Sequence, residues 1–292
     1  MRRLIRYAFL LAALGLGAFW VLTRPETLSD DALDGLTADA TRGEQVFHAS
    51  GCASCHSAPG AEGDAGLILS GGQTFPSPFG TFTAPNISSD PTHGIGGWTT
   101  MDLANAMKHG VSPDGQHYFP AFPYTSYARA TLQDIVDLRA YLATLPASQV
   151  ASLPHNVGFP FNVRRSLGGW KLLFADDSWV TDASSPELER GRYLVEALGH
   201  CGECHTPRNA LGGTDRAQWL SGAPDPSGKG KIPSIRPPTL DWAQADLVYY
   251  FESGFTPEFD SVGGHMAHVV ANLSKLPPED RAAIAAYLMA LE

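Results

Sequence analysis

Two short segments of the chain share the pattern Cys-x-x-Cys-His. They are Cys52-Ala53-Ser54-Cys55-His56 and Cys201-Gly202-Glu203-Cys204-His205, and together they contain all four cysteines. This pattern attaches haem covalently, because two thiols one tight turn apart reach both vinyl groups and the histidine supplies the proximal nitrogen. The sequence therefore predicts two covalently attached haem c groups. The predicted attachment residues are Cys52, Cys55 and His56 for the first group and Cys201, Cys204 and His205 for the second.

Two other uses of paired cysteines fit the sequence less well. Zinc knuckles usually place their Cys-x-x-Cys pairs about 15–20 residues apart, whereas 146 positions lie between Cys55 and Cys201. A dithiol redox pair needs no histidine, and His is 10 of 292 residues, so its presence after both motifs by chance is roughly one in a thousand. Covalent haem is the favoured interpretation, and it leaves no cysteine for a structural disulfide.

Further motifs carry a resemblance to a known family. They are Asn86-Ile87-Ser88, Gly94-Ile95-Gly96-Gly97-Trp98, Pro120-Ala121-Phe122-Pro123-Tyr124, and Gly263-Gly264-His265-Met266 ahead of a final Tyr-Leu helix. With the two haem motifs, the chain after residue 40 resembles a dihaem class I cytochrome c, similar to cytochrome subunits of periplasmic sugar, alcohol and aldehyde dehydrogenases. Those subunits commonly carry three haem motifs and this chain has two, so the resemblance does not identify a dehydrogenase partner.

The first 24 residues have the composition of an export segment. Arg2, Arg3 and Arg6 precede an uncharged run that ends at Leu22, as in a signal sequence with its positive charge on the cytoplasmic side. Residues 4–22 would span about 28 Å as a helix, close to a hydrocarbon core of about 30 Å. We expect residues 1–24 to be a signal anchor in the bacterial inner membrane, with the haem domains facing the periplasm. The alternative is a soluble periplasmic protein, because Ala13-x-Gly15 and Gly15-x-Gly17 are weak cleavage sites.

The charge of the chain excludes one class of partner. The formal net charge is −10, and without the four arginines of the export segment 16 basic residues remain against 30 acidic ones. Nucleic acid is therefore not an expected partner. The acidic surface either steers the protein towards basic redox partners or simply keeps it soluble.

An internal repeat predicts the fold. Thr41-Arg42-Gly43 precedes the first motif as Glu189-Arg190-Gly191 precedes the second, with Gly-to-Cys spacings of 9 and 10 residues. Amphipathic helices close both halves, with Tyr141-Leu142 matching Tyr287-Leu288. We predict an all-α chain of two tandem cytochrome c domains, residues 41–147 and 186–292. The resemblance implies that the first and last helices of each domain cross beside the haem.

The loops and the connection between the halves complete this prediction. Gly- and Pro-rich stretches between each motif and its closing helix predict long irregular loops. Thr131 is a predicted N-cap, and Pro278 is predicted in a first helical turn. The linker, residues 148–185, is too apolar for a flexible tether, so we expect it to pack across both domains. The alternative is a loop that covers only one of them.

The sixth iron ligands are predicted on separate grounds. Met266 is the candidate for the second haem, because a thioether on a glycine-rich loop matches the family and Met/His ligation raises the potential; His265 and His268 are alternatives. In the first domain, Phe122 stands where the related run carries a ligand methionine. His117 is our candidate there, because it follows His56 by 61 residues, as Met266 follows His205. The remaining candidates are His93, His109, Met101 and Met107.

The sequence thus predicts an electron-transfer protein with no substrate pocket. It would carry electrons in the periplasm from a dehydrogenase towards a terminal oxidase or a small cytochrome. A rival hypothesis is a dihaem enzyme, such as a peroxidase with an open first haem or a thiosulfate-oxidising cytochrome. The latter needs a cysteine thiolate on iron, and haem attachment uses all four cysteines. A third possibility is a subunit held permanently in a larger complex.

Overall fold

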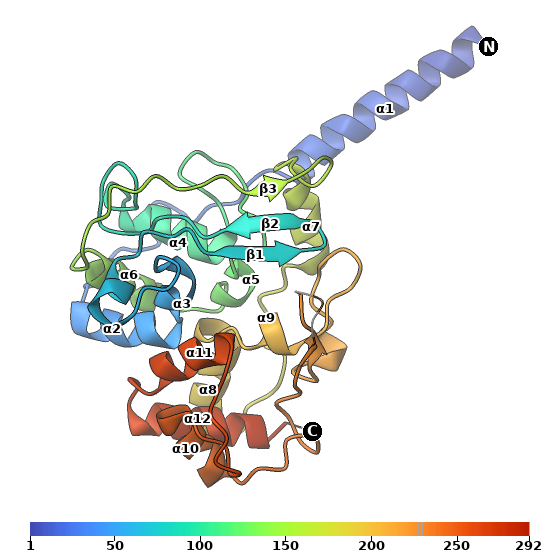
Figure 1. Ribbon diagram of the computed structural model, residues 1–292. Helices are drawn as coiled ribbons and strands as arrows, with labels where there is room; N and C mark the ends of the chain where they lie inside the picture. The colour runs from blue at the N-terminus through green and yellow to red at the C-terminus, as the bar shows by residue number, and fades with distance from the viewer. Residues whose placement is uncertain (227, 229, 292) are drawn as a thin grey trace.

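The computed structural model describes residues 1–226, 228 and 230–291. A long helix, α1 (Arg2–Leu22), projects from a body made of two helical halves, as Figure 1 shows. In the described part of the chain, α1 is the one helix long and apolar enough to cross a membrane, and none of its residues is buried. Length and composition alone give this result, and a signal sequence meets the same test.

The two halves have the same order of elements. The first half contains α2 (Ala40–Ala49), α3 (Cys52–His56), η1 (Gly63–Leu67), β1 (Thr74–Ser77), β2 (Gly80–Thr83), α4 (Thr100–His109), α5 (Tyr124–Tyr127) and α6 (Leu132–Leu142). The connection contains β3 (Asn156–Val157) and α7 (Ser166–Phe174). The second half contains α8 (Pro186–Arg192), η2 (Tyr193–Leu198), α9 (Gly202–His205), η3 (Arg216–Gln218), β4 (Ala223–Pro224), β5 (Lys231–Ile232), α10 (Gln244–Ser253), α11 (His265–Leu273) and α12 (Pro278–Met289).

A glycine sets the crossing of the first and last helices in each half. A Cβ on Gly43 would lie 2.0 Å from the Asp137 carbonyl oxygen, and a Cβ on Gly191 would lie 2.0 Å from the Ala283 carbonyl oxygen. Only glycine lets two helix backbones approach this closely. The implied crossing of α2 with α6 and of α8 with α12 is therefore present in both halves.

The extra residue before the second haem motif has a structural explanation. The first half reaches its motif through the regular α-helix α2. In the second half, α8 continues into η2, a π-helix over Tyr193–Leu198. A π-helical turn takes one residue more than an α-helical turn, so it accommodates the 10-residue Gly-to-Cys spacing without moving the crossing.

Both predicted helix starts in the closing helices are confirmed. The Thr131 hydroxyl accepts a hydrogen bond from the backbone N–H of Asp134 at the start of α6, and Pro278 is the first residue of α12. Each closing helix packs on a core that crosses the boundary between the halves. One continuous buried cluster includes Phe47 and Ile135 from the first half and Leu194 from the second.

The prediction of a purely all-α chain needs a correction, because short antiparallel strands are present. The strands β1, β2 and β3 form one sheet, and β4 pairs with β5 in another. Phe75 pairs with Phe82 across the β1–β2 hairpin. Such aromatic pairs favour a pleated arrangement, and this signal lay within a Gly/Pro-rich stretch that we expected to be irregular.

The connection contacts both halves. In α7, the Lys171 ammonium donates to the Gly110 carbonyl oxygen of the first half at 2.9 Å. The Trp170 indole donates to the Leu211 carbonyl oxygen of the second half at 2.9 Å. Downstream, the backbone N–H of Val180 donates to the Glu196 carboxylate in η2 at 2.7 Å. These contacts fix the connection against the body instead of leaving it a free tether.

Candidate haem-attachment sites

Each Cys-x-x-Cys-His motif forms one short helix, α3 in the first half and α9 in the second. The residue before each first cysteine is left-handed, with φ of 58° at Gly51 and 41° at His200. This conformation turns the chain sharply into the motif, and it is one that few residues other than glycine adopt. The repeat therefore keeps its local geometry even where its sequence changes.

The four cysteines are free thiols in the described chain. Desolvation raises the pKa of Cys52 and of Cys201 to about 12 and the pKa of Cys55 to about 11. Such thiols are protonated at neutral pH, unlike thiols that act as nucleophiles or metal ligands. The described residues also contain no cluster of three or more His, Cys, Asp or Glu that could hold a metal ion. These observations favour thioether attachment over zinc or dithiol chemistry.

The two motif histidines make the same hydrogen bond. His56 Nδ1 lies 2.9 Å from the Pro85 carbonyl oxygen, and His205 Nδ1 lies 2.8 Å from the Pro233 carbonyl oxygen. A carbonyl only accepts, so Nδ1 carries the proton and Nε2 keeps its lone pair. Burial lowers the pKa of both histidines, against a smaller opposite effect of these hydrogen bonds. Both imidazoles therefore suit the role of a neutral proximal ligand.

A matching loop supports both histidines from below. The Gly71 N–H donates to the His56 carbonyl oxygen, and the Gly222 N–H donates to the His205 carbonyl oxygen, both at 2.7 Å. Gly71 and Gly222 have φ of +73° and +88°, where a side chain would be strained. The two attachment sites are thus built from equivalent parts.

Met266 lies in the first turn of α11 and is half-buried. Its neighbour His265 is exposed and has its ring centroid 6.1 Å from that of Phe75, and His268 is also exposed. The structure thus places Met266 further from solvent than either histidine alternative.

His117 is buried, but its surroundings belong to the end of α1. Its Nε2 lies 2.9 Å from the Thr23 carbonyl oxygen, and its Nδ1 has no hydrogen-bond partner in the described residues. Its assignment as the sixth ligand stays a prediction, as does that of Met266. Among the alternatives, Met107 is buried in the core cluster, whereas the His93 ring lies 3.4 Å from the Asp90 carboxylate.

A shared loop gives the residue equivalence that counting missed. Val111 pairs with His117 and Phe255 pairs with Ser261 in isolated antiparallel bridges. Gly110 and Gly254, both left-handed, precede these bridges, and their carbonyl oxygens accept from Tyr118 and Val262 at 2.7 Å. His117 therefore corresponds to Ser261.

Five residues further along each loop, Phe122 corresponds to Met266. The equal spacing of 61 residues arises because the first half has five more residues between the motif histidine and the loop glycine. It therefore gives His117 no support. The glycine at the end of the preceding helix, followed by a six-residue step, was the signal that could have shown this from the sequence.

Comparisons with known proteins agree with this duplicated architecture. The family model for cytochrome c matches residues 40–146 and again residues 188–292. The chain belongs to the cytochrome c family. It is 58% identical over 275 residues to a protein from Cereibacter sphaeroides named "Diheme cytochrome c-type", covering 94% of this chain and 93% of that protein. Together these matches establish a dihaem cytochrome c that carries two covalently bound haem c groups.

Other relatives are cytochrome subunits of dehydrogenases. The cytochrome is 36% identical over 256 residues to the "Fructose dehydrogenase cytochrome subunit" of Gluconobacter japonicus, with 85% of this chain and 51% of that subunit covered. It is 35% identical over 277 residues to the "Gluconate 2-dehydrogenase cytochrome c subunit" of Pantoea cypripedii, with 90% of this chain and 61% of that subunit covered. The cytochrome thus spans about half to three-fifths of these subunits.

In this cytochrome, each haem motif also contacts the other domain. The third residue of the first motif, Ser54, accepts a hydrogen bond from Asn272 Nδ2 in α11 of the second domain at 3.0 Å. The equivalent residue of the second motif, Glu203, accepts from Thr125 and Ser126 in α5 of the first domain, at 3.2 and 3.4 Å. Because α5 and α11 both follow the loop that carries Phe122 or Met266, the two contacts are reciprocal.

The residues before the motifs complete the seam between the domains. His200 Nε2 lies 3.3 Å from the Ser50 carbonyl oxygen, and the Tyr127 and His200 ring centroids are 5.6 Å apart. The charge of Cys204 also contributes to raising the pKa of Cys55, which places the second cysteines of the two motifs near each other. The cytochrome therefore brings its two attachment sites together across one interface.

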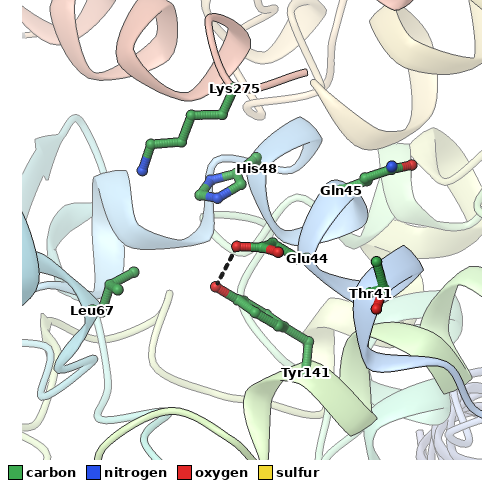
Figure 2. Close-up of a pocket in the computed structure, with 7 residues that line it drawn as sticks. All are labelled: Thr41, Glu44, Gln45, His48, Leu67, Tyr141 and Lys275. Carbon is green, nitrogen blue, oxygen red and sulfur yellow. Dashed lines mark hydrogen bonds between the residues drawn. The ribbon is translucent and has the colours of Figure 1, made fainter. Parts of the chain in front are cut away.

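A surface cavity of about 390 Å³ lies beside this seam. Figure 2 shows Glu44 and His48 from α2 with Tyr141 and Lys275 around it, and the Glu44–Tyr141 hydrogen bond measures 3.5 Å. No motif cysteine or motif histidine is among its lining residues. The cavity is therefore separate from the haem-attachment residues.

Proposed function

We propose that this chain is a membrane-anchored dihaem cytochrome on the periplasmic face of a bacterial inner membrane. It takes electrons from a dehydrogenase and passes them towards a terminal oxidase or a small cytochrome. The observation that carries the proposal is the reciprocal contact of the two haem motifs, through Ser54 and Glu203. A carrier with two adjoining redox centres needs such an interface, and single-haem carriers do not.

The roles of the residues follow from their chemistry. Cys52 and Cys55, and Cys201 and Cys204, would hold the two haems, which supply one-electron redox chemistry when bound. His56 and His205 would be the proximal ligands, oriented by the carbonyl oxygens of the two prolines. Met266 would complete the second site and His117 the first. The protein otherwise provides burial, which tunes the potential.

The donor is proposed from the relatives. Several related proteins are named as cytochrome subunits of fructose, gluconate or alcohol dehydrogenases. The surface of the chain carries a net charge of −10, which would attract a basic docking face. A dehydrogenase is accordingly the proposed donor, without a choice among sugar, alcohol and aldehyde substrates.

Rapid one-electron reduction tests the proposed carrier. A pulse of reductant limited to less than one electron per molecule is followed by absorbance at a wavelength that separates the two haems. We expect a first-order redistribution phase whose rate does not change with protein concentration. A redistribution rate proportional to concentration would show that the haems exchange electrons only between molecules, which contradicts a two-centre carrier.

Matched variants probe the seam in the same experiment. Glu203→Ala removes the acceptor of the Thr125 and Ser126 hydroxyls, so we expect a slower intramolecular phase and an unchanged haem content. Glu252→Ala alters an exposed carboxylate on α10 and serves as the control. Equal rates in both variants would show that the Glu203 contact does not set the arrangement of the two centres.

One observation favours a second candidate function. Phe122, which cannot bind iron, occupies the position equivalent to Met266, and its ring packs 5.7 Å from Tyr127 and 5.8 Å from Tyr118. A first haem without a sixth ligand would have the open site that a peroxidase needs. Peroxide-dependent oxidation of a reduced donor, absent after cyanide addition, would support this function; a first haem that binds neither cyanide nor peroxide would exclude it.

A further inference from the structure

Exposed apolar side chains gather around the base of α1. They come from the connection between the domains and from one loop of the second domain. This apolar collar consists of Phe159, Phe161, Val163, Leu172, Leu173 and Leu211, which are 43–84% exposed. Soluble proteins rarely expose contiguous apolar residues without a binding role.

The collar is one connected surface. The ring of Phe161 packs against that of Phe79 at 5.1 Å, at the tip of the β1–β2 hairpin. A Cβ on Gly212, next to Leu211, would lie 3.0 Å from the Phe79 ring. Leu211 in turn accepts the Trp170 hydrogen bond from α7. Figure 1 shows α7 and the β1–β2 hairpin near the base of α1.

The end of α1 is fixed against this collar. A Cβ on Gly168 would lie 2.4 Å from the Thr23 carbonyl oxygen, so α7 and the end of α1 are in backbone contact. The Arg165 guanidinium lies 4.2 Å from the Trp20 ring centroid and donates to the Thr23 hydroxyl at 3.0 Å. Thr23 itself is 2% exposed. The collar therefore has a set position relative to α1.

The exposed leucines belong to the same side of α7 as these contacts. Leu172 follows Gly168 by four residues, and Leu173 follows Gly169 by four residues. Residues four apart share one helix face, and Gly168 and Gly169 both contact the end of α1. The face that receives α1 thus continues, one turn later, as an exposed apolar surface.

The charge around the collar is opposite to that of the whole chain. Between Asp137 and Asp176 the sequence has no Asp or Glu, although the chain carries 30 acidic residues against 20 basic ones. The same stretch contains Arg164, Arg165 and Lys171. Apolar side chains next to basic ones, without acidic ones, are typical of segments that lie in the headgroup layer of anionic membranes.

We propose that the apolar collar lies in the interfacial layer of the bilayer that α1 spans, and so sets the orientation of both haem domains on the membrane. This rests on the membrane anchor of the proposed function. The occupant of the collar is lipid, because a span that begins in contact with α7 brings the bilayer surface to the collar. A protein partner on the same surface is the competing outcome of the test.

Lipid photo-crosslinking of the full-length holoprotein tests the collar. The protein is reconstituted in nanodiscs of phosphatidylethanolamine and phosphatidylglycerol that contain a phospholipid with a diazirine on its acyl chain. We expect label on α1 and on the peptide covering residues 158–174. Tyr249 and Phe255, exposed on the second domain at 51% and 45%, are the internal control and should stay unlabelled.

The outcomes separate the anchor from the collar. Label on α1 without label on residues 158–174 overturns the collar and leaves the anchor standing. No label on either overturns both. Label that is equal on residues 158–174 and on the peptide of Tyr249 overturns the collar, because it shows unspecific contact with lipid.

A pair of variants gives the proposal a second test. L172E/L173E should lose the label on residues 158–174 while label on α1 and both haem spectra are kept, because these leucines are exposed and distant from the haem motifs. Y249E is the matched control and should leave the labelling pattern unchanged. L172F/L173F, which keeps the apolar character, should restore the label; a failure to restore it would overturn the role of apolar contact.

Discussion

The distal loops of the two domains have the same backbone and opposite chemistry. The first places His117 and Phe122 where the second places Ser261 and Met266, on loops with the same bridge and the same left-handed glycine. In the second domain the ligand candidate is a soft thioether, and in the first the equivalent position is an aromatic ring among tyrosines. The comparison shows that duplication kept the scaffold that orients the proximal histidine while the distal side diverged.

Replacing the thioether of the second domain should have the largest effect. Met266→Leu keeps the size of the side chain and removes the sulfur, so we expect a lower midpoint potential for the second haem only. The change should be a sizeable part of the roughly 0.8 V range that axial ligands span, and each 59 mV is a tenfold change in the electron equilibrium. Spectroelectrochemical titration measures it. Met289→Leu in α12 is the control, and unchanged potentials in Met266→Leu would remove Met266 from the site.

Converting the first distal loop into the second is the next test. The double variant His117→Ser and Phe122→Met reproduces Ser261 and Met266, so we expect the potential of the first haem to rise towards that of the second. The single variant His117→Ser tests the predicted ligand, because near-infrared magnetic circular dichroism reports the axial pair of each haem. A bis-histidine signal that persists in His117→Ser would assign the ligand to another histidine.

The sequence predicted the proximal side better than the distal side for a physical reason. Haem attachment needs its residues within one turn, so Cys52, Cys55 and His56 are adjacent in the chain and visible as a motif. The distal residue lies more than 50 positions away, beyond loops that differ in length between the domains. The helix crossing was also predictable, because Gly43 and Gly191 repeat. The β1–β2 hairpin and the π-helix were not, because local sequence alone does not reveal tertiary pairing or a one-residue helix insertion.

The shared helix crossing should respond alike in both domains. Gly43→Ala and Gly191→Ala each place a Cβ 2.0 Å from a carbonyl oxygen of the closing helix. We expect each to lower the free energy of unfolding by about 1–3 kcal/mol, as overpacking does. Denaturant unfolding of the holoprotein measures this loss. Gly158→Ala, with nothing within 4 Å of its added Cβ, is the control. A large loss in one domain only would show that the crossings are not equivalent.

The smallest expected difference concerns the ion pair beside each crossing. Arg42 donates from Nε to Asp137 at 2.8 Å in the first domain, whereas Arg190 donates from Nε to Asp280 at 2.7 Å in the second, which lies one helical turn nearer the start of its closing helix. Burial would raise the pKa of Asp137, but hydrogen bonds from Arg42, the Asp39 N–H and Gln133 outweigh it and hold this pKa below its ordinary value.

A lowered folded-state pKa gives a definite direction to the pH dependence. The contribution of Asp137 to stability is fully present above the ordinary carboxyl pKa of about 4 and is lost as the pH falls through the lower folded-state pKa. We expect Asp137→Asn to cost about 1 kcal/mol at neutral pH and less in acid, so that its unfolding free energy converges with that of the natural chain. Unfolding measured from neutral pH to pH 3, with the exposed Asp241→Asn as control, would contradict this if the cost stayed constant, because a charge-independent loss would make the carboxylate a packing element only.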